Sequence, residues 1–164
     1  MLSVFMRFII DYSNKNRKMN LQVKYYQESD YNDLVKLLDE SFGTKIGKDM
    51  LEAHYVNDTH NIILAKAQNG EMCGCALFEK KIDYIRDNPV LFISFLAVDE
   101  RYIRNGIGKL LMEYLEQICE QMGCSAIELT SADWRVDAHR FYNAIGFSRK
   151  KTTVFIKEIG SKSE

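Results

Sequence analysis

Residues 92–122 read FISFLAVDERYIRNGIGKLLMEYLEQICEQM, and the rest of the chain is organised around them. With Val90 and Leu91 before it, the stretch begins as a nearly unbroken apolar run, interrupted only by Ser94, as in a central strand covered on both faces. It ends with apolar residues at helical spacing, and Gly123 is placed to end that helix. The junction Gly106-Ile107-Gly108 therefore lies where a strand gives way to a helix.

This glycine junction predicts an anion-binding site. Glycines at 106 and 108 have no Cβ atoms, so a ligand can approach the backbone closely. The first N–H groups of a helix have no acceptor within it, and the helix dipole adds positive potential there. A pyrophosphate is the anion that such an arrangement favours. A tight turn that needs small residues explains the glycines equally well, so the pattern alone leaves both interpretations open.

The composition favours one domain with a small-molecule or protein partner. The chain has 164 residues, 46% of them hydrophobic, and a net charge of −1 from 22 basic and 23 acidic groups. This length supports one core, and the balanced charge argues against a nucleic-acid partner. Four cysteines without a secretory signal favour reduced thiols and a cytoplasmic location. The pair Cys73 and Cys75 has no second group of ligands nearby, so no metal site is predicted.

Residues 1–18 are set apart as an N-terminal appendage. Their apolar run is interrupted by Arg7 and Asp11, and neither a basic segment before it nor a small-residue cleavage site after it is present. The run is too short to span a bilayer, so no membrane partner is expected. Three interpretations of the appendage stay open: an artefact of start-site choice, a disordered tail, or an extra strand that pairs with a partner chain. A single domain is expected over residues 19–164.

The first half of that domain has clear local signals. Alternation over 21–25 predicts a strand, and a helix is expected behind Ser29 or Asp30. A weaker helix is expected over 48–57. The Asn69-Gly70 pair between the apolar runs 62–67 and 73–78 predicts a hairpin.

The second half is expected to complete a mixed sheet with helices on both faces. A strand at 126–129 forms a parallel βαβ unit with the glycine helix and the strand before it. A short helix that contains Phe141 and Tyr142 stops at Gly146, and Phe147 and Thr152–Ile156 are expected as closing strands. The predicted element order is β-α-α-β-β-β-α-β-α-β, which belongs to the α/β (α+β) class.

Three separated motifs resemble the GNAT superfamily of N-acetyltransferases, and the resemblance covers residues 20–158. Leu96-Ala97-Val98 followed by the Gly106-Ile107-Gly108 turn is similar to the acetyl-CoA motif of that superfamily. The helix 138–142 with Ile145-Gly146-Phe147 resembles its second motif, and 69–77 with Gly74 resembles the hairpin before its central strand. The resemblance implies a GNAT-like, mostly antiparallel sheet with a central parallel βαβ unit.

The resemblance also implies an activity. It is the direct transfer of an acetyl group from acetyl-CoA, as co-substrate, to a primary amine of a small molecule or peptide. An inactive acyl-CoA-binding module and a protein N-terminal or lysine acetyltransferase are the alternatives. A homodimer is one expectation from the family, and the identity of the amine is left open.

Individual roles follow from the same motifs. The backbone of Leu96 and Val98 would hold the pantetheine, and the N–H groups of residues 104–109 would hold the pyrophosphate. The cofactor-binding set is Leu96, Ala97, Val98, Arg104, Asn105, Gly106, Ile107, Gly108 and Lys109. Tyr142 would be the general acid, because a phenol with a pKa of about 10 is protonated at neutral pH and can protonate a thiolate with a pKa of about 8.5.

The general base and the acceptor site have weaker signals. The central strand offers only Ser94 as a polar residue, so Glu79, on the strand before it, is named as the base, with Glu128 as the other candidate. Arg135 and His139 are assigned to the acceptor, because the planar fork of an arginine suits a carboxylate or phosphate. Two positions depart from the superfamily pattern: Ile103 stands where a Gln or Arg is usual, and Arg135 stands where an Asn is common.

Overall fold

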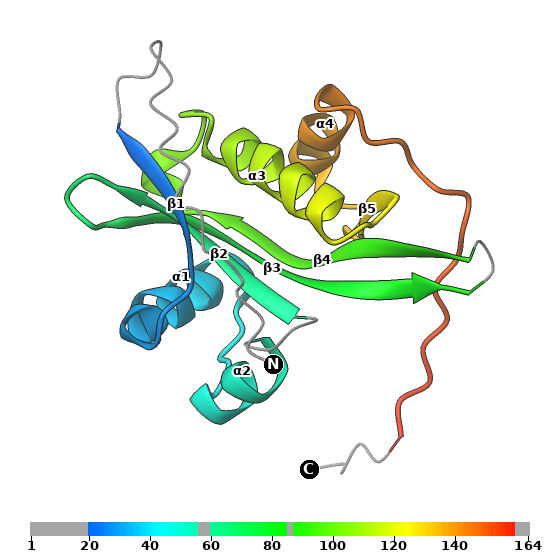
Figure 1. Cartoon of the computed structure of the whole chain (residues 1–164), viewed down its shortest axis with the longest axis horizontal. Coiled ribbons are helices and arrows are strands. Elements are labelled where there is room, and N and C mark those ends of the chain that lie inside the picture. The colour runs from blue at the N-terminus through cyan, green and yellow to red at the C-terminus, as the bar shows by residue number, and fades with distance from the viewer. Residues whose placement is uncertain (1–19, 56–59, 85–86, 160–164) are drawn as a thin grey trace. The chain divides into compact units, whose positions relative to one another are not determined.

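The computed structural model describes residues 20–55, 60–84 and 87–159 (Figure 1). The chain divides after Thr130 into two compact units, which are described one at a time. Two predicted segments lie outside the described residues: the appendage over residues 1–18 and the end of the helix expected over 48–57. Within the described part of the chain, no helix is both long and apolar enough to cross a membrane.

The first unit is built on a five-stranded sheet in the order β1-β2-β3-β4-β5. The strands are β1 Leu21–Tyr25, β2 His60–Ala67, β3 Met72–Asp83, β4 Asn88–Val98 and β5 Ala126–Leu129. The first four pair antiparallel with their neighbours, whereas β4 and β5 are parallel. This confirms the predicted fold class, a mixed and mostly antiparallel sheet with a parallel βαβ unit.

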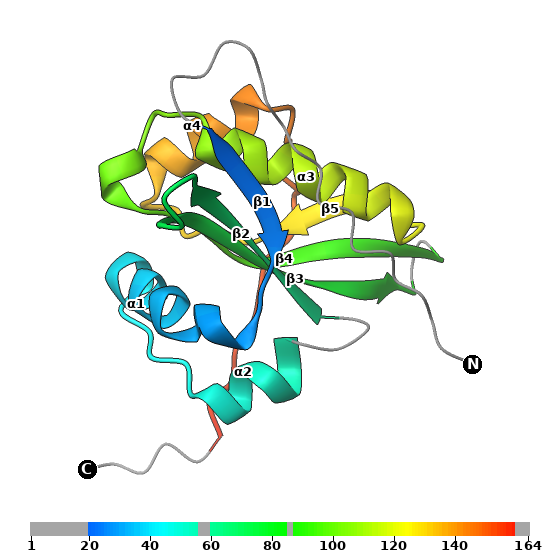
Figure 2. The ribbon, with the colours of Figure 1, turned by 60° about the vertical axis from the view of Figure 1, so that its left-hand side comes forward.

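Helices cover both faces of this sheet (Figure 2). They are α1 Tyr31–Phe42, α2 Lys48–Tyr55 and α3 Ile107–Gln121, with short 3₁₀ turns at Glu28–Asp30 and Glu100–Tyr102. On the face of α1 and α2, Leu34, Leu38 and Leu51 are fully buried in one core with Cys75 and Leu77 of β3. On the other face, α3 buries Ile107, Leu111 and Leu115. The apolar residues of α1 and α3 recur with a period of 3.6 residues, and this is the reason that the sequence predicted these two helices.

Gly74 of β3 allows α3 to approach the sheet closely. A Cβ atom added at this glycine would lie 2.9 Å from the carbonyl oxygen of Ala97 and 2.9 Å from Cγ2 of Ile107. Real Cβ atoms do not make contacts this short, so no other residue fits without a shift of the strand or the helix. Gly74 thereby determines how near the first turn of α3 lies to β3 and β4.

The second unit contains helix α4, Val136–Ala144, and the chain that follows it. Gly146, with φ of 97°, ends the helix, and the N–H of Phe147 donates back to the carbonyl of Tyr142 at 2.9 Å. This turn is typical of a helix C-terminus with a left-handed residue.

The closing strands expected at Phe147 and Thr152–Ile156 are wrong. Residues 147–159 form neither strand nor helix, and Val154, Phe155 and Ile156 are 79%, 92% and 85% exposed. The N–H of Phe147 is engaged at the helix end. The segment 152–156 has β-branched and aromatic residues, but strand propensity is realised only where a neighbouring strand pairs with the segment.

Candidate active site

The first turn of α3 presents unpaired backbone donors. Gly106 is the N-cap residue, with φ of 77°, and no side chain caps the helix there. The first intrahelical bond runs from the N–H of Leu110 to the carbonyl of Gly106, at 3.0 Å. The N–H groups of Ile107, Gly108 and Lys109 therefore precede any helical acceptor. No acidic residue lies in this first turn, so its positive potential is not offset locally.

The loop before α3 extends this row of donors. Arg104, like Gly106, has a left-handed backbone, with φ of 64°. The N–H groups of Tyr102, Ile103 and Asn105 donate to carbonyls within the loop, whereas those of Arg104 and Gly106 have no acceptor among the described residues. The predicted phosphate-binding residues 104–109 thus form one continuous backbone turn. The side chain of Ile107 is 1% exposed and belongs to the core, so only its N–H group is available to a ligand.

The end of β4 has an open edge next to this loop. The N–H of Asp99 donates to the carbonyl of Cys73 on β3 at 3.0 Å. Because successive N–H groups of a strand point to opposite edges, those of Val98 and Leu96 point away from β3. On that side β5 pairs with β4 only from Val90 to Ile93. No strand of the described sheet pairs with the edge from Ser94 to Val98.

A β-bulge marks the place where the edge opens. Leu77 of β3 is opposite Phe95 of β4, but the next residue, Phe78, is opposite Ile93, which leaves Ser94 without a partner position. A bulge bends a strand and increases its twist, and both effects separate β4 from β5 beyond Ile93. The one polar residue in the apolar run is therefore the extra residue of the bulge.

The two candidate bases lie in one row of the sheet. Glu79 of β3 is opposite Phe92 of β4, and Phe92 is opposite Glu128 of β5. The row lies on the face of α1 and α2, because Glu79 follows Leu77 by two residues. Glu79 forms an ion pair with Lys81, at 2.9 Å, and the Lys81 ammonium lies 3.4 Å from the centroid of the Phe92 ring. The structure thus places the two carboxylates in one row of the sheet, with Phe92 of β4 between them.

Tyr142, the candidate acid, lies on α4 among aromatic rings. Its ring centroid is 5.4 Å from that of Phe141 and 5.8 Å from that of Phe147. Burial raises the pKa of the Tyr142 phenol above its usual value, and the positive charge of Arg135 offsets part of this rise. The phenol is therefore protonated at neutral pH, as a proton donor must be.

The two candidate acceptor residues are one helical turn apart. Arg135 immediately precedes α4, and its carbonyl accepts from the N–H of His139 at 3.1 Å. The guanidinium carbon of Arg135 lies 5.1 Å from the centroid of the Trp134 ring, within the range of a cation–π contact. Positions i and i+4 share one side of a helix, so Arg135 and His139 can face a common ligand.

A comparison with protein families identifies the chain. The model of the acetyltransferase (GNAT) family matches residues 24–147. The protein belongs to the GNAT acetyltransferase family. Its predicted enzyme class, an acyltransferase, is thereby confirmed.

Similar proteins include several aminoglycoside acetyltransferases. The aminoglycoside N(6')-acetyltransferase type 1 of Serratia marcescens is 24% identical over 102 residues, which are 60% of this chain and 70% of that protein. The structure of an aminoglycoside acetyltransferase from an uncultured soil metagenomic sample, in complex with sisomicin, has a TM-score of 0.75 at 19% identity and covers 85% of this chain and 97% of its own. AAC(6')-Iy in complex with a bisubstrate analogue of CoA has a TM-score of 0.75 at 16% identity, with 85% and 99% covered. Each structural likeness shows the fold.

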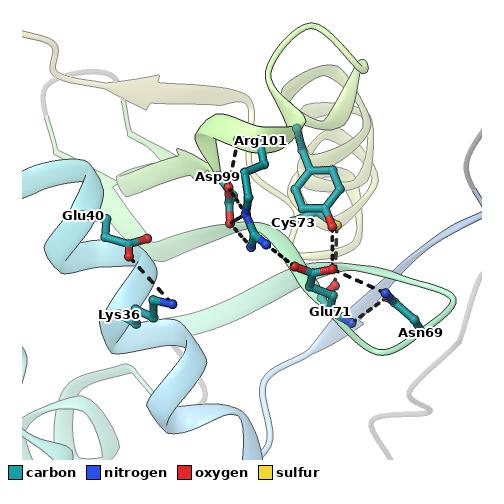
Figure 3. Close-up of polar contacts among 8 residues, drawn as sticks. Lys36, Glu40, Asn69, Glu71, Cys73, Asp99 and Arg101 are labelled. Carbon is teal, nitrogen blue, oxygen red and sulfur yellow. Dashed lines mark hydrogen bonds and ion pairs between the residues drawn. The ribbon is translucent and has the colours of Figure 1, made fainter.

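In this GNAT protein, a polar cluster that the sequence did not predict lies beside the glycine loop (Figure 3). Glu71, which follows the Asn69-Gly70 turn, accepts hydrogen bonds from Arg101 and from the hydroxyl of Tyr102, the latter at 2.7 Å. Arg101 also donates through Nε and Nη2 to Asp99. Glu71 and Tyr102 are 31 residues apart and carry no joint motif, so only the pairing of β3 with β4 brings them together.

Proposed function

We propose that this protein transfers an acetyl group from acetyl-CoA to a primary amine of a small molecule or peptide. One observation carries the proposal: the open edge of β4 and the uncapped, glycine-initiated first turn of α3 lie at the two ends of one short loop, residues 99–106. Both present unpaired N–H groups, as does Arg104 in the loop between them, in a member of the acetyltransferase family. We further propose that residues 19–164 act as one catalytic domain.

In this proposal the cofactor lies along these donors. The pantetheine amides pair with the backbone of Leu96 and Val98 and extend the sheet past Ala97, as an added strand does. The pyrophosphate accepts from the N–H groups of residues 104–109. Arg104 and Lys109 add positive charge. Because most of these contacts involve the main chain, Ile103 in place of a Gln or Arg weakens binding without abolishing it.

The reaction exchanges one acyl bond for another. A neutral amine nitrogen attacks the thioester carbonyl, the C–N bond forms, and the C–S bond breaks to release the thiolate of CoA. Tyr142 is proposed to give its proton to that sulfur, since its pKa is raised and the phenol is therefore protonated. Glu79, directly or through water, is proposed to remove a proton from the amine, with Glu128 in the same row as the alternative.

The acceptor is proposed to be a small molecule. The relatives named for aminoglycosides support a small polyamine, whereas Arg135 and His139 favour an acceptor that carries an anionic group. Steady-state kinetics with polyamines and with amines that carry an anionic group distinguish these two classes of acceptor. The Arg135→Ala variant should raise the KM of an anionic acceptor about fivefold and leave that of a polycationic acceptor unchanged or lower.

The decisive test measures thiol release from acetyl-CoA against a panel of small amines, aminoglycosides and peptides, with the acetylated product identified by mass spectrometry. We expect one amine to be acetylated with release of one thiol per amide. Binding of CoA without amide formation for any amine would indicate the inactive acyl-CoA-binding module instead. Selective acetylation of peptides would indicate the protein acetyltransferase.

A further inference from the structure

The cluster around Glu71 joins two segments that are distant in the sequence (Figure 3). Glu71 is at the end of the β2–β3 turn, and the turn itself is fixed, because the Glu71 N–H donates to Asn69 Oδ1 at 3.1 Å and the Ala67 N–H donates to the Glu71 carbonyl at 2.9 Å. Its carboxylate uses both oxygens on the loop before α3: Oε1 accepts from Arg101 and Oε2 from Tyr102. The hairpin turn therefore holds the loop through charge-assisted bonds.

Arg101 is fully engaged inside this cluster. Its Nε donates to Asp99 Oδ1 at 3.1 Å and its Nη2 to Asp99 Oδ2 at 2.6 Å, a two-pronged contact, while Nη1 reaches Glu71. The side chain of Asp99 is only 12% exposed. Two carboxylates thus share one guanidinium. Arg101, which precedes the proposed phosphate-binding residues by three positions, is oriented toward the protein's own acids.

Tyr102 links the cluster to the donor row. Its hydroxyl donates to Glu71, and its carbonyl accepts from the N–H of Asn105 at 3.3 Å. Arg104, between these two residues, has the left-handed backbone that costs a non-glycine residue roughly 1 kcal/mol. A loop with such a residue relaxes to other conformations unless neighbouring contacts hold it. The Tyr102–Glu71 bond is a contact of that kind.

The bond persists over a wide pH range. The hydrogen bond to Glu71 raises the pKa of Tyr102 to about 12, so its phenol keeps its proton. Tyr102, Asn69 and Arg101 together lower the pKa of Glu71, so its carboxylate remains charged.

We propose that Glu71 and Tyr102 are positioning residues for acetyl-CoA: through them the β2–β3 turn holds loop 99–106 in the conformation that binds the pyrophosphate. This inference rests on the proposed function of the same loop. Neither side chain touches the cofactor in this proposal. Both act through the backbone N–H groups of residues 104–109, so their loss weakens cofactor binding and leaves the chemical step unchanged.

The Tyr102→Phe variant tests this without a change of charge. We expect the Kd for CoA and the KM for acetyl-CoA to rise about three- to tenfold while kcat stays within about twofold. We also expect faster hydrogen–deuterium exchange at the amides of Ile103 and Asn105, which donate hydrogen bonds within the loop of the ligand-free protein. Unchanged CoA affinity together with unchanged exchange would overturn the inference.

A second variant separates positioning from charge. Glu71→Ala removes a negative charge near an anionic ligand, so electrostatics alone would tighten CoA binding, whereas loss of the tether weakens it. Glu100→Gln is the matched control, because Glu100 is exposed in the same loop and its removal changes the charge equally. Weaker binding only in Glu71→Ala, and no further loss in the double variant with Tyr102→Phe, supports the inference. Tighter binding in both single variants overturns it.

Failure of the proposed function would be recognised separately. A wild-type protein that binds no CoA contradicts the proposed function. The exchange measurement on the ligand-free protein still reports whether Glu71 and Tyr102 hold the loop.

Discussion

The two regions proposed to act in catalysis are built in different ways. Loop 98–109 presents main-chain N–H groups, shaped by the left-handed residues Arg104 and Gly106 and by the missing side chain at Gly74. Segment 135–147 presents side chains, with Tyr142 between two aromatic rings. In the proposed function, the backbone geometry of the first region binds the cofactor, and individual side chains of the second region carry the chemistry. Substitutions in the two regions should therefore differ in size and in the kinetic parameter they change.

The largest effect is expected for Tyr142→Phe. Loss of the proton donor should lower kcat by about ten- to a thousandfold while the KM for acetyl-CoA stays the same. Steady-state kinetics measure both parameters. Tyr84→Phe is the matched control, since Tyr84 is exposed on the first unit and lies outside both regions. Near-normal turnover in Tyr142→Phe would reject the role of Tyr142 as general acid. Segment 135–147 would then lack its proposed catalytic side chain.

The next effect is expected for Gly106→Ala. A Cβ atom at φ of 77° strains the backbone by about 1–2 kcal/mol, which turns the N–H groups of the first turn away from the ligand. The KM for acetyl-CoA should rise about three- to tenfold, with kcat nearly constant.

Gly123→Ala controls for this strain. Gly123 has φ of 64° and follows the other end of α3, so its substitution should cost similar stability but leave the KM unchanged. Equal changes of KM in both variants would mean that general destabilisation, rather than loop geometry, weakens binding.

Gly74→Ala should act on stability first. The new Cβ atom would meet the Ala97 carbonyl and the side chains of Ile107 and Leu111, which should cost about 1–3 kcal/mol of unfolding free energy. Urea denaturation measures this cost. Gly47→Ala is the control, because no atom lies within 4 Å of its added Cβ and its backbone is not left-handed. An unfolding midpoint equal to that of the wild type would show that α3 can shift freely on the sheet.

The smallest effect is expected for Ile103→Arg. Ile103 is 54% exposed and offers no side-chain donor, so an arginine there should lower the KM for acetyl-CoA by about two- to threefold at low salt and less at high salt. Ile103→Gln, which adds donors without charge, should show a smaller gain that is independent of salt. If Ile103→Arg lowered the KM for acetyl-CoA by as large a factor as Tyr142→Phe lowers kcat, this would contradict the view that the loop binds the cofactor mainly through its backbone.

Local signals made most of the fold predictable. The helices follow from a 3.6-residue period, and the hairpin follows from Asn69-Gly70, where Gly70 has φ of 84°. The strand at 152–156 was predicted wrongly because β-rich composition does not show whether a partner strand is present. The segment has the composition of a strand, but it forms no strand in the described structure.

Contacts that depend on the register of paired strands could not be predicted from the sequence. The Glu71–Tyr102 bond depends on how β3 pairs with β4, and the row of Glu79 and Glu128 depends also on how β4 pairs with β5. The pairing of β3 with β4 contains a bulge, which no periodicity of the chain reveals. The glycine loop could be located in advance because its signal is confined to a few consecutive residues.

The bulge at Ser94 also changes which residues of β4 face each side of the sheet, because it adds one residue that has no partner on β3. Ile93 is opposite Phe78 and Phe95 is opposite Leu77, so these two residues of β4 point to opposite faces although they are two positions apart. Odd-numbered residues face α3 before Ser94 and the core of α1 and α2 after it, where Phe95 and Ala97 pack. The bulge thus interrupts the simple alternation of β4 once, at Ser94, and the strand supplies residues to both cores on either side of it. Deletion of Ser94 would remove the bulge and make Ile93 and Phe95 neighbours on the opposite faces that they already occupy, so Phe95 and Ala97 would keep their places in the core.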